Sequence, residues 1–215
     1  MRNSTQAGRD RTQFVLQCGC VMDIGRGGYV NVCVEHKAMP SFEDFKRALH
    51  TLPPTSESLH VINQFNERRS QEIREAHGVR AVETWAELPL VGNVILTTIG
   101  AKTGKERIVP LGAIRRDSNL LLKASVCGSP THPAWYYNVT ANPNVLVETC
   151  GYRYPATARV ADGEERTELW RYYAAFRPIQ DEFQSMVDRE IPVVVLTQTG
   201  APLHRSPAGS DSPSE

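Results

Sequence analysis

The sequence lacks an excess of charge of either sign and lacks any long apolar run. Its 24 lysines and arginines balance 24 aspartates and glutamates, so no overall charge attracts nucleic acid or an anionic membrane surface. No stretch approaches the roughly 18 apolar residues that a membrane-spanning helix needs. We therefore predict a globular protein that does not bind nucleic acid, in which any anion-binding site is local.

Cysteines and secretion signals are also scarce. The five cysteines among 215 residues are odd in number and scattered, which argues against a disulfide framework and is typical of a reducing compartment. The N-terminal stretch MRNSTQAGRDRTQ has arginines but no apolar core or cleavage site, so it does not resemble a secretory signal. We expect a cytoplasmic protein.

Residues 1–58 show no sustained helical or strand period and predict a poorly structured extension with one short helix. The helix lies in PSFEDFKRALHTL, where Ser41 can cap its N-terminus and Phe42, Phe45 and Leu49 have helical spacing. Two prolines then end it.

The extension also contains four potential metal ligands. They form a C-x-C and C-x-x-H set at Cys18, Cys20, Cys33 and His36. C-x-C is a poor chelating span compared with C-x-x-C, and no predicted strand or helix holds the segment. We predict no metal site here and consider Met39 as a candidate start of the native product.

The following residues predict a mixed α+β barrel. LPLVGNVILTTIG, RIVPLGAIRRD and LLLKAS are strands joined by tight turns, NVLVETCGYRYPATARVAD is a hairpin, and IPVVVLTQT is a buried strand. Helical segments lie at VINQFNERRSQEIREAHG, at HPAWYYNVTANP and, interrupted by Pro178, at GEERTELWRYYAAFRPIQDEFQSMV. About six mainly antiparallel strands usually close or stack to hide their edges. We predict a barrel domain over residues 59–199 and a disordered tail over 200–215.

The turn in TTIGAKTGKERIVPL nearly matches a phosphate-binding P-loop. Gly100 and Gly104 bracket three residues where that motif has four, and Glu106 stands where a hydroxyl should reach a magnesium ion. A strand follows the turn in place of a helix, which excludes P-loop and Rossmann folds. The turn can form an anion nest rimmed by cations, or it can be an ordinary solvated hairpin tip. The cations are Lys102, Lys105 and Arg107.

A second candidate region, KASVCGSPTHPAWYYN, joins the end of a strand to the start of a helix. Ser129, Thr131 and Trp135 can flank a flat ring near the free N–H groups of the helix start. Aromatic residues at helical spacing more often pack a core, so both interpretations stay open. We assign no acid or base role to His132, which precedes a proline.

Four blocks in this order resemble the deazaflavin-dependent nitroreductase family, actinobacterial oxidoreductases that use coenzyme F-420. They are LPLVGNVILTTIGAKTGKERIVPLGAI, LLLKASVCGSPTHPAWYYNVTANPNVLVE, ARVADGEERTELW and DREIPVVVLT. The resemblance runs from about Phe65 to about Thr197. It implies a split β-barrel related to FMN-binding oxidoreductases with flanking helices. It also implies hydride transfer from the reduced deazaflavin to a quinone-like or nitroaromatic acceptor.

The resemblance further implies site residues, because its cofactor is a flat ring that carries a phosphodiester and an oligoglutamate tail. The phosphate is received by the basic turn, at Lys102, Thr103, Gly104, Lys105 and Arg107. The cofactor groove is lined by Pro110, Ser125 and Trp135. The acceptor site is walled by Tyr172, Tyr173, Phe176 and Phe183, with packing of the helix on the barrel an equal alternative for half of these. The resemblance implies no covalent residue and no metal.

Two departures from the family pattern bear on affinity. The family usually reads A-S-K-G-G where this chain has Val126 and Cys127 after Ser125, and many members have an arginine in place of Ala101. Each departure removes a cation, and a hydrogen bond to a charged group contributes roughly 1.5–3 kcal/mol. We therefore expect a cofactor site with fewer cations than is usual in the family.

Three alternatives stay open. FMN, a shorter phosphate-bearing ring, could be the cofactor of the same fold, and a non-catalytic carrier of the deazaflavin or of an apolar ligand would need no turnover. Weak association with the inner face of the cell membrane is a further alternative, although FEDFKRALHTL has little apolar area. The sequence leaves the oligomeric state open.

Overall fold

The computed structural model describes residues 13–15, 21–23, 28–31, 40–76 and 82–205 of the chain. The chain forms two compact units, Met1–Met39 and Pro40–Glu215. The first unit has an antiparallel sheet of β1 (Gln13–Val15), β2 (Val21–Asp23) and β3 (Gly28–Asn31) in that order. These strands lie in the segment that the sequence predicts to be poorly structured.

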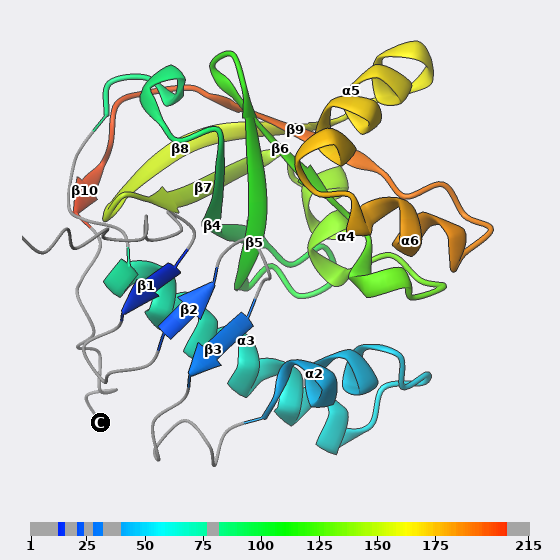
Figure 1. Ribbon diagram of the computed structural model, residues 1–215. Coiled ribbons are helices and arrows are strands. Elements are labelled where there is room, and N and C mark those ends of the chain that lie inside the picture. The colour runs from blue at the N-terminus through cyan, green and yellow to red at the C-terminus, as the bar shows by residue number, and fades with distance from the viewer. Residues whose placement is uncertain (1–12, 16–20, 24–27, 32–39, 77–81, 206–215) are drawn as a thin grey trace, which may run out of the picture. The chain divides into compact units, whose positions relative to one another are not determined.

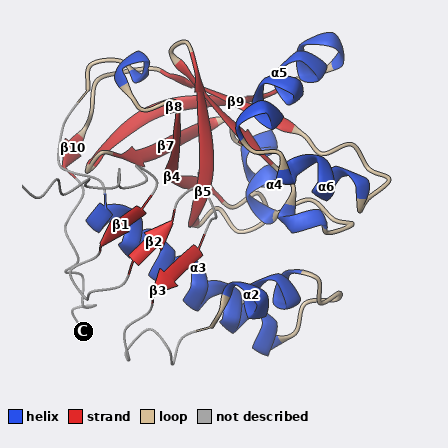
Figure 2. Ribbon diagram, viewed as in Figure 1, coloured by secondary structure: helices blue, strands red, loops and turns tan. Residues whose placement is uncertain are grey.

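The second unit is built on a closed six-stranded antiparallel barrel (Figures 1 and 2). Pairing runs β8-β7-β4-β5-β6-β9, and a β8–β9 pairing closes the ring. The mixed α+β barrel predicted from the sequence is confirmed. The strands are β4 (Val91–Ile99), β5 (Glu106–Arg116), β6 (Asn119–Lys123), β7 (Asn144–Thr149), β8 (Tyr152–Val160) and β9 (Val193–Gln198).

Alternation along the strands separates two apolar layers. Inward side chains such as Leu96, Leu122 and Leu196 fill the barrel, and Trp85 joins them from a 3₁₀ turn (η1, Trp85–Glu87). Outward side chains, including Ile114, form a second cluster under α5 (Gly163–Phe176). Burial of both layers supplies the main apolar stabilisation of the unit.

Helices surround the barrel, and their ends follow sequence signals. In α2 (Phe42–Leu49) the Ser41 hydroxyl accepts from the Asp44 N–H and the Asp44 carboxylate accepts from the Ser41 N–H, so the predicted cap is confirmed. The break at Pro178 separates α5 from α6 (Ile179–Ser185), as predicted. The remaining helices are α3 (Ser56–Ala76), α4 (Ala134–Ala141) and the 3₁₀ turn η2 (Val126–Gly128).

Two element bounds differ from the segments that the sequence analysis set apart. Helix α3 begins at Ser56, within residues 1–58, because Thr55 and Ser58 exchange side-chain hydrogen bonds at its first turn. Strand β10 (His204–Arg205) lies within residues 200–215 and pairs with the outer edge of β8. This pairing partly covers an otherwise open strand edge.

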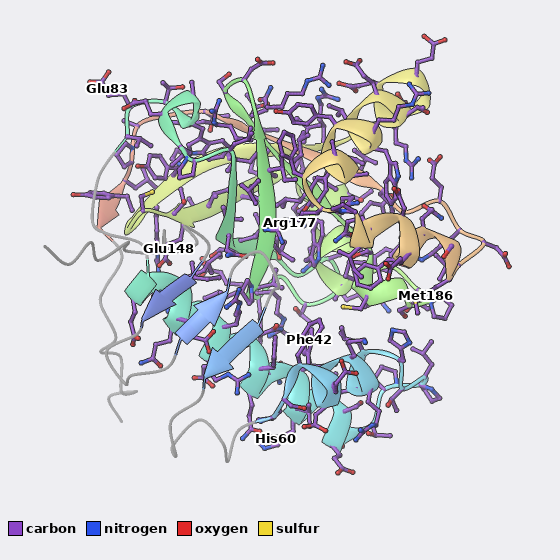
Figure 3. All side chains as sticks on the ribbon, viewed as in Figure 1. Phe42, His60, Glu83, Glu148, Arg177 and Met186 are labelled. Atoms are coloured by element: carbon purple, nitrogen blue, oxygen red, sulfur yellow. The ribbon has the colours of Figure 1, made fainter. Side chains whose placement is uncertain are left out.

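A partly buried ion pair joins helix α3 to the barrel. Arg74 donates from Nε and Nη2 to the two carboxylate oxygens of Glu148 at 2.7 and 3.1 Å. Glu148 lies on β7 with 4% of its surface exposed, and Arg153 lies 3.7 Å from its second oxygen (Figure 3). Such two-pronged pairing fixes orientation as well as distance.

Candidate functional site

The barrel is open along one edge of β5. Strand β5 pairs with β4 from Glu106 to Ile114 but with β6 only from Ile114 to Arg116. Over residues 106–113 no strand of the described chain pairs with the other edge of β5. The chain leaves β6 at Lys123 and enters η2. This opening is the split that the family resemblance implies.

The basic turn lies at one end of the open edge and depends on its glycines. Gly100 N–H donates to the carbonyl of Lys105 at 2.8 Å, and Gly104 N–H donates to the carbonyl of Gly100 at 2.8 Å. A Cβ at Gly100 would lie 2.6 Å from the Thr103 hydroxyl, and Gly104 has φ +66°. Only glycine suits both positions without strain, so the two glycines shape a compact tip.

The tip presents uncompensated positive charge. Lys102, Lys105 and Arg107 are exposed, and in the described part of the chain no carboxylate forms an ion pair with them. Glu106 is the one acidic residue in the turn sequence. Side chains of this kind bind phosphate and carboxylate groups well. The donor set therefore fits an anionic chain at this end of the split.

Asn138 on α4 anchors the turn to the barrel, a role that the sequence analysis missed. Its Oδ1 accepts from the Ala101 N–H at 3.0 Å and its Nδ2 donates to Thr98 Oγ1 at 3.0 Å. The side chain is buried, so both bonds are shielded from water. Its only sequence signal is its place three residues after Trp135 in the HPAWYYN block.

The η2 turn, which follows Ser125, has an unusual backbone. Val126, Cys127 and Gly128 have φ of +49°, +50° and +80° in succession. Left-handed backbone is costly for non-glycine residues and most so for a β-branched one. Cys127, with φ +50°, and Val126, with φ +49°, therefore hold this turn at a cost of backbone strain.

Two helices hold η2 in this conformation. From α2, His50 donates through Nε2 to the Cys127 carbonyl at 3.2 Å. From the end of α6, Met186 lies so near that a Cβ at Gly128 would be 2.7 Å from its Sδ. Burial raises the pKa of the Cys127 thiol to about 11, so it stays protonated at neutral pH and is a poor nucleophile.

Arg189 holds the same loop from a third direction. Its Nη2 donates to the carbonyls of Ala124 and Ser125 at 3.2 and 3.1 Å, and its Nε donates to the Ser129 carbonyl at 3.1 Å. Its Nη1 lies 3.0 Å from Nδ1 of His132. The sequence analysis quoted Arg189 in the DREIPVVVLT block but gave it no role. One guanidinium thus joins the end of β6 to the start of α4.

The aromatic residues predicted for the groove and the acceptor site divide by burial. Trp135 is 6% exposed and belongs to the barrel core, and Tyr173 is 3% exposed with its hydroxyl donating to the Gly112 carbonyl at 3.1 Å. Tyr172 is half-buried and donates to the Arg115 carbonyl at 3.0 Å. Of the two alternatives in the sequence analysis, acceptor-site wall and packing on the barrel, packing therefore fits both tyrosines. Phe176 is 39% exposed.

The remaining predicted residues lie on either side of the split. Pro110 lies within β5, paired with Ile95 of β4, and Ser125 lies at the start of η2. Both are partly exposed. Phe183 is half-buried on α6. The structure thus places the basic turn and Pro110 on or next to the open strand β5, Ser125 after β6, and the aromatic residues on helices α4, α5 and α6.

The sequence analysis missed two cations, Arg177 at Gly112, near the closed end of the split, and Lys123 beside the rings of α5. The guanidinium of Arg177 covers Gly112, so a Cβ at this glycine would be 3.4 Å from its Cζ (Figure 3). Lys123, 8% exposed, places Nζ 3.8 Å from the ring centroid of Trp170 and 4.3 Å from that of Tyr173. Burial lowers the pKa of Lys123 to about 6, so its amine is largely neutral at pH 7.

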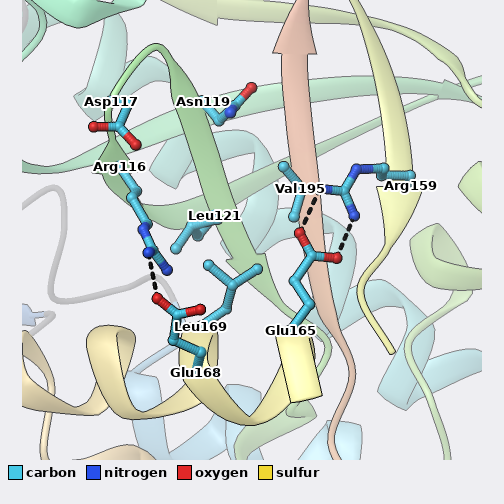
Figure 4. Close-up of a pocket in the computed structure, with 9 residues that line it drawn as sticks. All are labelled: Arg116, Asp117, Asn119, Leu121, Arg159, Glu165, Glu168, Leu169 and Val195. Atoms are coloured by element: carbon cyan, nitrogen blue, oxygen red, sulfur yellow. Dashed lines mark hydrogen bonds and ion pairs between the residues drawn. The ribbon is translucent and has the colours of Figure 1, made fainter. Parts of the chain in front are cut away.

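A separate pocket of about 220 Å³ lies on the outer face of β6 and β9 beside α5 (Figure 4). Two ion pairs flank it, Arg116 with Glu168 and Arg159 with Glu165. None of the residues predicted for cofactor or acceptor lines it. Its arginines already have carboxylate partners, so it is a weak candidate for an anion.

The split antiparallel barrel is the fold that the family resemblance implies. The sequence model described as F420H(2)-dependent quinone reductase matches residues 66–198, more than half of the chain. The chain therefore belongs to this family. The resemblance stated from the sequence and the prediction of an F-420-dependent oxidoreductase are confirmed.

Individual proteins that are similar to this chain have related descriptions. The chain is 34% identical over 110 residues to the putative F420H(2)-dependent quinone reductase Rv3178 of Mycobacterium tuberculosis, covering 49% of this chain and 89% of that protein. It is also 34% identical to the F420H(2)-dependent quinone reductase Rv1261c of the same species, covering 49% and 73%. A solved F420-H2 dependent reductase (FDR-A) is 38% identical, with a TM-score of 0.45 and coverage of 55% and 99%.

Two further observations concern the described residues alone. No helix among them is both long and apolar enough to cross a membrane. No group of three or more His, Cys, Asp or Glu side chains among them could hold a metal ion. The C-x-C and C-x-x-H set at Cys18, Cys20, Cys33 and His36 lies outside the described residues.

Proposed function

We propose that this protein transfers a hydride from reduced coenzyme F-420 to a quinone-type acceptor bound beside the split of the barrel. The observation that carries the proposal is the exposed basic turn at the end of the open β5 edge, in a chain that belongs to an F-420-dependent family. A phosphodiester with an oligoglutamate tail needs such a turn, whereas a neutral cofactor does not.

The residues of this chain would hold the cofactor at two points. Lys102, Lys105 and Arg107 would bind the phosphate or tail, while Ser125 and Pro110 would lie beside the ring. When bound, the reduced deazaflavin supplies the hydride. The protein supplies orientation, since reacting atoms must be held at near-attack distance. Asn138 and Arg189 support the two ends through main-chain contacts.

The acceptor would lie against apolar side chains that the fold leaves exposed. Phe176 is 39% exposed, Ile179 is 45% exposed, and Met186, at the end of α6 beside η2, is 62% exposed. These side chains can exclude water from a flat, apolar ring. Phe183 on α6 completes the set that we propose. Tyr172 and Tyr173 attach α5 to β5 through their hydroxyl groups, which donate to the carbonyls of Arg115 and Gly112.

A direct assay tests the proposed function. Purified protein is mixed with reduced F-420 and menadione, and reoxidation of the deazaflavin is followed by absorbance. We expect a rate well above that of a control without protein. Tight F-420 binding without turnover would support the carrier alternative, and binding of FMN but not of F-420 would support an FMN-dependent enzyme.

Nitroaromatic compounds are a second class of acceptor, since they are also flat and easily reduced. Replacing menadione by a nitroaromatic compound in the same assay compares the two classes. We propose the quinone as the preferred acceptor because the family description names it. A higher kcat/KM for the nitroaromatic compound would contradict that preference and leave the cofactor assignment intact.

A further inference from the structure

In the contact between His132 and Arg189, the chemistry of arginine decides which ring nitrogen of His132 carries the hydrogen. Arginine stays protonated in proteins and can only donate. With Nη1 of Arg189 3.0 Å from Nδ1 of His132, Nδ1 must be the acceptor and carry no hydrogen. The neutral ring then carries its proton on Nε2. An imidazolium would direct one N–H against another and place two positive charges together.

The surroundings of His132 favour the neutral ring. The titratable or charged groups near it are Arg189, from the loop before β9, and Tyr136 and Tyr137, from α4, which begins two residues after His132. Burial lowers the pKa of His132 and the Arg189 charge lowers it further. No described residue accepts a hydrogen bond from Nε2, so this N–H is available to a ligand.

The loop and helix joined by Arg189 carry two residues of the proposed site, Ser125 and Asn138. Arg189 also donates to the carbonyls of Ala124, Ser125 and Ser129. On the same helix as Tyr136, Asn138 holds the basic turn. Along the chain, His132 lies between Ser125, which we propose beside the ring, and Asn138, which positions the cationic tip.

We propose that Arg189 is a positioning residue that fixes His132 as the Nε2–H tautomer, so that His132 offers a neutral hydrogen-bond donor to an oxygen of the phosphate-bearing chain of F-420. The recipient in this inference rests on the proposed function, whereas the tautomer does not. Neither residue takes part in hydride transfer. Their effect is on binding and on its dependence on pH.

The tautomer is tested on the protein without cofactor. Long-range ¹H–¹⁵N NMR spectra of the histidine rings distinguish protonated from unprotonated nitrogens, and His132→Gln assigns the signal. Between about pH 6 and 8 we expect wild-type His132 to keep an unprotonated Nδ1 and a protonated Nε2. In Arg189→Met we expect mixed tautomers and a titration midpoint nearer the ordinary histidine value.

Conservative and control variants separate this role from a merely structural one. Arg189→Lys keeps a donor for Nδ1 and should keep the tautomer, although it loses contacts to the carbonyls. Arg159→Met removes an exposed arginine elsewhere and should leave the His132 signals unchanged. A proton on Nδ1 in the wild type, or an Arg189→Met titration equal to wild type, overturns the proposal.

Binding of F-420, followed by fluorescence, tests the donor. His132→Leu should raise Kd about tenfold, the effect of losing one hydrogen bond to a charged group. His132→Gln places an amide near the former Nε2 and should stay within about threefold of wild type. His132→Asn places its amide near Nδ1 and should resemble Leu. Equal affinity of all three variants and the wild type overturns the donor role.

The two proposals fail in different ways. If wild-type protein binds no F-420, the proposed function and the recipient of the His132 hydrogen bond are both contradicted. The NMR spectra still decide whether Arg189 fixes the tautomer. If F-420 binds and turns over but His132 titrates normally, the proposed function stands and the role of Arg189 is contradicted.

Discussion

At the residue scale, Lys123 shows how a lysine can be buried without an ionic partner, by losing its charge. Its Nζ lies against the rings of Trp170 and Tyr173 and has no hydrogen-bond partner among the described residues. Burial is the largest cause of its lowered pKa, with Arg166 and Arg177 adding to it and Asp181 opposing it. The folded state therefore holds this amine in its neutral form at pH 7.

Lys123→Met should stabilise the protein. At pH 7 the folded state must release a proton that the unfolded chain keeps on Lys123, which lowers stability. We expect Lys123→Met to remove this cost and raise the free energy of unfolding at pH 7 by more than about 1.4 kcal/mol, the value of one unit of pKa difference. Urea unfolding at pH 7 measures it. A loss of stability would show that the contacts of Lys123 with the two rings outweigh the cost of its burial.

The same residue gives a pH dependence of defined sign. The pKa of Lys123 is about 6 in the folded state and near 10.5 in the unfolded chain, so between these values the unfolded state binds more protons. Stability of the wild type then rises with pH through this window. The difference between Lys123→Met and wild type should shrink steadily from pH 7 to pH 10. A constant difference would contradict the burial of a neutral amine.

The cations of the basic turn carry the third prediction at the residue scale. Lys102→Ala combined with Arg107→Ala should raise the Kd for F-420 about tenfold or more, because one or two charged contacts are lost. Fluorescence titration measures this. Arg159→Ala with Arg171→Ala, both exposed, is the matched control and should change Kd by less than about twofold. An unchanged Kd in the turn variant would remove this turn from the binding site.

The sequence indicates residues whose chemistry is local and misses residues whose role is set by tertiary contacts. The basic turn could be predicted because its glycines and cations lie within a few positions. Asn138 and Arg189 act on carbonyls or N–H groups far along the chain, and no local spacing signals such a role. Tyr173 shows the opposite case, since its helical spacing suits both a pocket wall and a packed core, and burial decides.

At the element scale, the attachment of α3 to the barrel depends on the pair of Arg74 with Glu148. Among the described residues, Arg74→Met would leave the buried Glu148 carboxylate with the longer contact to Arg153 at 3.7 Å as its remaining ion pair. Leaving a buried charge uncompensated costs about 3–5 kcal/mol, and we expect a loss near about 3 kcal/mol in chemical unfolding.

A surface pair of the same type is the control for this prediction. Arg116 pairs with Glu168, whose side chain is 63% exposed. Arg116→Met should lower the free energy of unfolding by less than about 1 kcal/mol. Equal losses in Arg116→Met and Arg74→Met would contradict the view that burial makes the α3 contact important.

Element order was predictable, whereas the conformation of η2 was not. Strand and helix periods, Ser41 and Pro178 are strong local signals, and the structure has elements at these places. The left-handed backbone at Val126 and Cys127 contradicts their intrinsic preferences. It is held by His50, Met186 and Arg189, which come from distant parts of the chain. Tertiary contacts here override local preference.

At the scale of the whole molecule, the second compact unit contains every residue of the proposed site. The unit Pro40–Glu215 includes the basic turn, the η2 loop and helices α2 to α6. A chain that begins at Pro40 should therefore bind F-420 with a Kd within about threefold of the full chain, measured by fluorescence titration. A much larger Kd in a truncated chain that still unfolds cooperatively would show that residues 1–39 contribute to the site.

Closure of the barrel is a whole-molecule property that the sequence suggests only in outline. The strand periods predict antiparallel pairing, but the β8–β9 pairing joins segments about 40 positions apart, such as Ala158 with Leu196. The split follows from the limited pairing of β5 with β6. Neither feature has a local signal, because each depends on where a strand lies when the sheet curves.

Because Lys123 lies over the Trp170 ring, the fluorescence of this tryptophan reports on the protonation of the lysine. The chain has three tryptophans, Trp85 and Trp135 in the barrel core and Trp170 in the outer layer. Within the part of the chain that the structure describes, Trp170 is the tryptophan with an amine against its ring, at 3.8 Å. Indole emission responds to a nearby charge, so protonation of that amine at mildly acidic pH gives a spectral signal from one known place. The layer between α5 and the barrel can thus be followed without any label.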